Sequence, residues 1–153
     1  MKKLLVALGV LVAQAAFAHG THGSDTNEWP AGLRNYGGEP SRAAAKNVDV
    51  KTAWETTFAG EFASHPWLAS FGKQRLSELT SFNSRMYVLY EGCKPEDCEG
   101  ERYLMLFDPN SGKAYGAFRT DAQSETKIHW LGQPDEPIQT YMASHLFEFA
   151  EAH

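Results

Sequence analysis

Runs of apolar residues separated by short polar stretches occupy the middle of this chain. Four such runs, rich in aromatic, β-branched and long apolar side chains, cover residues 84–92, 101–108, 113–120 and 126–132. This composition is typical of β-strands. The turn sequence DPNSG joins the second run to the third, and the polar segment DAQSE joins the third to the fourth. Four consecutive strands with short connections predict an antiparallel meander.

The segments on either side of these runs have the apolar spacing of helices. Trp54, Phe58 and Phe62 recur every four residues, which predicts a helix over 49–63 with Asp49 as its N-cap. Near the end of the chain, one helix face is formed by Ile138, Tyr141, Met142, His145, Leu146 and Phe149. We expect this second helix to pack across the sheet. The predicted fold class is α+β, an antiparallel β-meander sheet with N-terminal and C-terminal helices packed on it.

The first 18 residues have the pattern of a secretory signal peptide. Lys2 and Lys3 precede the apolar stretch LLVALGVLVA, and the small-residue sequence AFA ends at Ala18. The apolar stretch is shorter than the roughly 20 residues of a membrane-spanning helix. We therefore expect cleavage after Ala18, a mature chain without a membrane anchor, and a periplasmic or secreted location. An uncleaved anchor or a short core helix are the alternatives.

Residues 19–47 contain many Gly, Pro, Asn and Ser residues and no sustained apolar period. This composition predicts a flexible N-terminal arm, which Trp29, Leu33 and Tyr36 could pin to the rest of the protein. Residues 48–153 are then expected to form a single α+β domain.

The charge balance is acidic. The sequence has 14 Lys and Arg against 19 Asp and Glu, a net charge of −5; loss of Lys2 and Lys3 leaves 12 against 19, or −7. Without a basic stripe to neutralise phosphates, nucleic acid and anionic membranes are disfavoured as partners. A basic protein partner would be attracted, although an acidic surface kept for solubility explains the same balance.

The sequence patterns of common catalytic sites are absent from the chain. It contains no Gly-rich phosphate loop, His-Glu-x-x-His pair, Gly-x-Ser-x-Gly elbow or Cys-x-x-Cys pair. We therefore predict a protein that is not an enzyme and has no cofactor. A mature chain starting at His19 would present its terminal amine, His19 and His22 as candidate ligands for Cu(II) or Zn(II). A mobile arm that merely contains histidines is the alternative.

The two cysteines of the chain lie in the six-residue segment CKPEDC, between the first two predicted strands. Export would place Cys93 and Cys98 in an oxidising compartment, and two cysteines allow one intramolecular pairing. Closing so short a loop contributes only about 2 kcal/mol to stability. With Pro95 restricting the backbone, the bridge would make a rigid projection that loses little entropy on entering a cleft. The alternative is a disulfide that only closes the hairpin and has no role in binding.

This segment and its surroundings resemble the periplasmic inhibitors of vertebrate-type lysozyme, the Ivy family. The signature of that family is a Cys-Lys-Pro-His-Asp-Cys loop between two strands, and this chain matches it at Cys93, Lys94, Pro95, Asp97 and Cys98. The segments KTAWETTFAG, PWL, GAFRT and KIHWLG are also similar to the family, so that the resemblance covers residues 51–132.

The resemblance implies an antiparallel sheet with helices on it and a function as a plug. The loop would enter the cleft of lysozyme, where the family histidine meets the two catalytic carboxylates. The implied partner is a lysozyme, and the resemblance also implies a homodimer as a candidate state, since some family members form dimers. Glu96 stands in place of the histidine, and an ionised glutamate cannot donate a hydrogen bond to a carboxylate. We therefore keep three hypotheses. Inhibition could persist through the rest of the loop, with Lys94 and the backbone supplying contacts; the target could be another muramidase or a lytic transglycosylase whose cleft offers a basic group to Glu96; or the protein could be a periplasmic binding module without inhibition.

Overall fold

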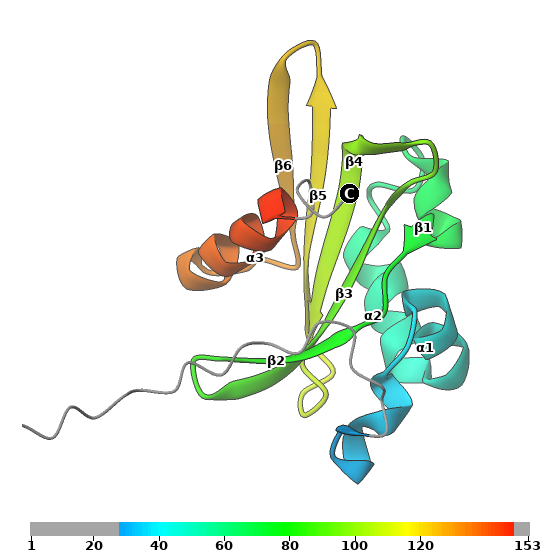
Figure 1. The fold of residues 1–153 in the computed structure, drawn as a ribbon, viewed down its shortest axis with the longest axis vertical. Coiled ribbons are helices and arrows are strands. Elements are labelled where there is room, and N and C mark those ends of the chain that lie inside the picture. Colours follow the sequence, from blue (N-terminus) through cyan, green and yellow to red (C-terminus); the bar gives the residue numbers. More distant parts are fainter. Residues whose placement is uncertain (1–27, 149–153) are drawn as a thin grey trace, which may run out of the picture.

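The computed structural model of the protein describes residues 28–148 (Figure 1). Its centre is one antiparallel sheet with the strands β1 (Lys73–Gln74), β2 (Glu78–Phe82), β3 (Arg85–Lys94), β4 (Asp97–Phe107), β5 (Ala114–Ala122) and β6 (Glu125–Leu131). The strands β3, β4, β5 and β6 follow one another across the sheet, and both β1 and β2 pair with the outer edge of β3. The predicted meander is confirmed, and two strands that the sequence did not reveal extend it.

Helices cover both faces of the sheet, as Figure 1 shows. On one side lie the 3-10 helix η2 (Ala31–Tyr36), α1 (Pro40–Lys46), α2 (Val48–Phe58) and the 3-10 helix η3 (Pro66–Ser70). On the other side lies α3 (Glu136–Glu148). The predicted α+β class is confirmed, and the C-terminal helix packs on the sheet through Ile138, Met142 and Leu146, as its spacing indicated.

Because both faces are covered, β3 and β4 are buried at successive positions. Residues 87–90 and 102–107 are all buried. Val88 and Tyr90 point to the side of α1 and α2, whereas Tyr87 and Leu89 point to α3. This explains why the sequence reads as continuous apolar runs instead of an alternation of apolar and polar residues.

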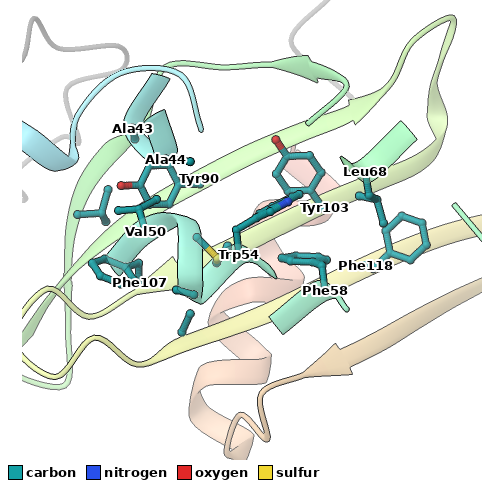
Figure 2. Close-up of a cluster of buried hydrophobic side chains, with 14 of the residues drawn as sticks. Ala43, Ala44, Val50, Trp54, Phe58, Leu68, Tyr90, Tyr103, Phe107 and Phe118 are labelled. Atoms are coloured by element: carbon teal, nitrogen blue, oxygen red, sulfur yellow. The ribbon is translucent and has the colours of Figure 1, made fainter. Parts of the chain in front are cut away.

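Aromatic side chains fill the core between α2 and the sheet (Figure 2). The ring of Trp54 stacks on Phe58 with centroids 4.2 Å apart and meets Tyr103 edge-on at 4.7 Å. The Tyr103 hydroxyl donates to the carbonyl oxygen of Phe71 at 3.1 Å. Tyr103 is opposite Gly92 in the ladder, so this rigid cluster lies next to the end of β3.

The predicted first helix is wrong at both ends. The helix covers Val48–Phe58 and its N-cap is Asn47, whose side-chain oxygen accepts from the amide of Asp49 at 2.9 Å. Beyond Phe58 the chain continues as turns through residue 64. Gly60, a poor helix former, lies in this turn region.

The prediction of irregular structure is wrong for residues 31–36, which form η2, and for residues 40–46, which form α1. Both helices are too short to show an apolar period in the sequence. The predicted pinning is confirmed, because Trp29 is only 3% exposed and both Leu33 and Tyr36 pack against the core. The predicted signal peptide, residues 19–27 with the candidate metal ligands His19 and His22, and Phe149 lie outside the described residues. Within residues 28–148, no helix has the length and apolar character needed to cross a membrane.

Candidate functional site

A disulfide between Cys93 and Cys98 closes the connection between β3 and β4, with the two Cα atoms 4.8 Å apart. Lys94 pairs with Asp97 across the hairpin, so Pro95 and Glu96 form a two-residue turn. Cys93 is fully buried, whereas residues 95–97 are exposed. The predicted loop is thus a projection whose base is fixed in the sheet and whose tip faces solvent.

Glu96 occupies the outermost position of this turn with a φ of 66°. This left-handed conformation costs most non-glycine residues roughly 1–2 kcal/mol. The disulfide and the Lys94–Asp97 pair flank this residue and restrict the backbone on both sides of it. Glu96 is thus an exposed carboxylate on a constrained backbone.

The ladder between β3 and β4 is interrupted at the base of the loop. The register moves from Cys93 opposite Arg102 to Lys94 opposite Asp97, which leaves residues 98–101 without a partner in β3. Polar contacts bridge this interruption. The Asp97 carboxylate accepts from the amide of Gly100 at 3.1 Å, and the buried Arg102 guanidinium donates to the carbonyl oxygen of Cys98 at 2.5 Å.

Lys94 does not extend toward the tip. Its ammonium group donates to Glu101 Oε1 at 2.7 Å and lies 3.6 Å from Asp97 Oδ2. The hydrogen bond to Glu101 raises the pKa of Lys94 above its ordinary value. The sequence suggested Lys94 as a source of contacts with a partner, but the side chain is engaged within the protein. Glu96 and Asp97 therefore dominate the charge at the exposed turn.

Glu101 is a residue that the sequence analysis missed. Its carboxylate also accepts from Trp67 Nε1 at 2.7 Å and from His65 Nδ1 at 3.0 Å. Burial would raise the pKa of Glu101, but the hydrogen bonds from Lys94, Trp67 and His65 lower it below the ordinary value. The available signal was a carboxylate at the start of a buried apolar strand, where an acid is rare without partners.

The residues around η3 and β1 lie against the end of β3, at the base of the loop. β1 pairs with the end of β3, with Lys73 opposite Cys93. At Gly72, which has a φ of +57°, a Cβ atom would lie 2.6 Å from the indole ring of Trp67. At Gly92 a Cβ atom would lie 2.5 Å from the Tyr103 hydroxyl. Glycine is required at both positions because the backbone and these rings approach each other so closely.

The histidines of the described residues are engaged in local contacts. His65 packs edge-on against Phe118 with centroids 4.5 Å apart, and His129 Nδ1 donates to Glu61 Oε1 at 3.1 Å. No group of three or more His, Cys, Asp or Glu side chains in residues 28–148 could hold a metal ion. Two surface hollows, of about 400 Å³ beside α2 and about 530 Å³ beside α3, contain no residue of the disulfide loop in their walls.

Comparison with known proteins identifies the family. A sequence model of the family described as "Inhibitor of vertebrate lysozyme (Ivy)" matches residues 49–146, more than half of the chain. The chain belongs to the Ivy family. The matched range includes the whole disulfide loop, η3 and the sheet, whereas η2 and α1 precede it.

Two Ivy relatives show the extent of the similarity. The inhibitor of vertebrate lysozyme of Pseudomonas aeruginosa PAO1 is 27% identical over 108 residues, which cover 63% of this chain and 70% of that protein. The inhibitor of vertebrate lysozyme of Escherichia coli K12 is 25% identical over 93 residues. That alignment covers 60% of this chain and 59% of the E. coli protein, less than two thirds of its length.

Proposed function

We propose that this protein is exported after cleavage at Ala18 and inhibits a lysozyme or a related peptidoglycan-cleaving muramidase. The loop of residues 93–98 enters the active-site cleft and blocks it. The observation that carries this proposal is the exposed Pro95–Glu96 turn on a disulfide-closed hairpin, in a chain that belongs to the Ivy family. Inhibition takes place outside the cytoplasm, and the protein has no catalytic role of its own.

The restricted conformation of the loop and the charge of the chain suit a protein that blocks an enzyme cleft. A lysozyme needs one protonated and one ionised carboxyl group and an open cleft for its sugar substrate. A projection that fills the cleft excludes the sugar. The disulfide and the two-residue turn restrict the loop before binding, so that little conformational entropy is lost on association. The expected net charge of −7 for the mature chain, from 12 basic and 19 acidic residues, would attract a basic lysozyme.

Glu96 determines how strongly a c-type lysozyme is inhibited. An ionised glutamate placed beside two carboxylates in a desolvated cleft costs several kcal/mol, unless it takes up a proton. Each 1.4 kcal/mol lowers the affinity about tenfold. We therefore propose weaker inhibition of c-type lysozyme than a histidine at this position would give.

A changed target is the second candidate function, and the charge of the tip favours it. Glu96 and Asp97 are exposed, while the Lys94 ammonium group is bonded to Glu101 and lies 3.6 Å from Asp97. Such a tip fits a cleft that offers a basic group, such as that of another muramidase or a lytic transglycosylase. A periplasmic binding module without inhibition would use the same two carboxylates for a basic partner.

The test is a titration of the mature protein into c-type lysozyme acting on cell walls, with the wild type and Glu96→His compared. The left-handed backbone at residue 96 accepts histidine better than most residues, so the variant should fold normally. We expect the wild type to inhibit and Glu96→His to inhibit at a concentration at least about tenfold lower. Glu125→His, at the exposed first residue of β6 beside the β5–β6 turn, is the control and should match the wild type.

The outcomes separate the candidates. Absence of inhibition by both proteins at micromolar excess would contradict the plug. Inhibition by Glu96→His alone indicates a changed target, which a titration against a lytic transglycosylase then tests. A pulldown that returns a basic protein other than a muramidase, and that depends on Glu96 and Asp97, would favour the binding module.

A further inference from the structure

The interruption in the β3–β4 ladder raises the question of what sets the direction of the loop. Residues 98–101 have no ladder partner in β3, so backbone pairing with β3 does not hold this side of the loop. The disulfide joins Cys93 to Cys98, and the Arg102 guanidinium donates to the carbonyl oxygen of Cys98. These contacts lie within the hairpin, and a contact from the hairpin to another part of the chain would restrict the direction of the loop further.

Glu101 is the last residue of the interruption, since β4 pairs with β3 again from Arg102 onward, and on its other side Glu101 is opposite Thr120 of β5. Its side chain is 17% exposed and accepts three hydrogen bonds. One donor is Lys94, at the start of the turn, and the other two are Trp67 in η3 and His65 just before it. One carboxylate therefore connects the loop to a separate part of the chain.

The donors on the η3 side have little freedom to move. The Trp67 ring faces Gly72 at a distance that leaves no room for a Cβ atom, and its centroid lies 6.1 Å from those of Tyr103 and Phe118. The His65 ring is packed on Phe118, and its Nε2 lies 4.0 Å from Glu61. The carboxylate of Glu101 is thus held in place from the side opposite to the loop.

We propose that Glu101 is a positioning residue that fixes the direction in which the loop projects, by holding Lys94 against the packed Trp67 and His65 side chains. Its effect on a lysozyme rests on the proposed function; its effect on the loop does not. An ionised carboxylate suits this role because its two oxygens accept all three hydrogen bonds. An amide has one acceptor oxygen and turns two N–H donors toward the remaining donors, so Glu101→Gln should release at least one contact.

The experiment compares the full mature chain with Glu101→Gln, Trp67→Phe and Glu99→Gln. Trp67→Phe keeps an aromatic ring but removes one donor. Glu99→Gln removes the same charge from an exposed position two residues away, and is the matched control. The first readout is amide hydrogen exchange, at residues 94–99 for the loop and at residues 103–107 for the buried part of β4. The second is the association rate, dissociation rate and inhibition constant with c-type lysozyme.

We expect Glu101→Gln to raise exchange at residues 94–99 about tenfold and to leave residues 103–107 unchanged. Trp67→Phe should have a smaller effect in the same direction, and Glu99→Gln none. If the wild type inhibits, Glu101→Gln should raise the inhibition constant about tenfold, mainly through faster dissociation.

Three results would overturn the positioning role. The first is unchanged amide exchange at residues 94–99 in Glu101→Gln. The second is an equal rise in exchange at residues 103–107, which indicates general destabilisation. The third is an unchanged inhibition constant for Glu101→Gln when the wild type inhibits. If the wild type does not inhibit at all, the proposed function fails, and the exchange measurements still decide whether Glu101 positions the loop.

Discussion

Removal of the disulfide should give the loop of residues 93–98 much more conformational freedom, while the domain as a whole stays folded. The change is Cys93→Ala together with Cys98→Ala. The bridge closes a loop of six residues, since the two cysteines are separated by 5 positions in the sequence. For a loop of this length the loss of chain entropy in the unfolded state amounts to about 2 kcal/mol. The β3–β4 ladder from Val88–Phe107 to Cys93–Arg102 does not depend on the bridge.

A second contribution comes from the buried sulfur. Cys93 is fully buried, so an alanine there leaves a small void that costs roughly 1 kcal/mol. The double variant should therefore lose about 2–3 kcal/mol of unfolding free energy. The reduced wild type retains both sulfurs and should lose only about 2 kcal/mol. This difference separates the bridge from the packing of Cys93.

The assay is urea unfolding followed by tryptophan fluorescence, combined with lysozyme inhibition. The slope against urea should stay unchanged, because the folded domain still buries the same surface. Inhibition should weaken in both proteins, since the loop must then be ordered during binding. A loss of more than about 5 kcal/mol, beyond the usual range for a disulfide, would show that the bridge holds the domain together. Full inhibition by the reduced protein would refute its role in shaping the loop.

Three further changes test the surroundings of the loop. Gly92→Ala should lower the free energy of urea unfolding by about 1–3 kcal/mol, because the new Cβ atom meets the buried Tyr103 ring. Gly60→Ala is the control, because no atom lies within 4 Å of a Cβ atom at that position. Equal losses of stability in the two variants would contradict overpacking at Gly92. Burial raises the pKa of Glu91 above 4.5, against the opposing effect of Arg75. The folded state therefore binds the proton more tightly than the unfolded state, and the free energy of unfolding falls as the pH rises from 4.5 through the raised pKa. Urea unfolding of Glu91→Gln across this pH range should lack that fall. Arg102→Met removes buried hydrogen bonds to the loop and to α3 and should cost about 2 kcal/mol in the same assay, with an unchanged midpoint as the contrary result.

The sequence was informative where local chemistry fixes the structure. The four meander strands follow from aromatic and β-branched runs between short turns, and their order follows from the short connections. The face of α3 was readable because the helix is long enough to repeat its apolar spacing. The first helix was placed less well because Asn47 and Asp49 are both good N-caps, and only the folded backbone shows that Asn47 accepts the bond.

Other elements depend on partners far along the chain. β1 has two residues, and β2 lies at the edge of the sheet with no fully buried side chain, so neither has a distinct apolar pattern. Their strand conformation comes from pairing with β3. The helices within residues 31–46 likewise depend on tertiary packing, since Ala43 and Ala44 are buried against the core. Short helices of this kind have little stability of their own.

By itself, the sequence determined the chemistry of the loop. Two cysteines allow one bridge, Pro95 restricts the turn, and Glu96 departs from the histidine of the family that the chain resembles. Only the tertiary structure decided where the charges point. Glu101 meets Trp67 and His65 across separations of 34 and 36 residues. The Glu101 carboxylate holds the Lys94 ammonium group at the base of the loop through a 2.7 Å hydrogen bond, a contact between side chains that no local sequence pattern records.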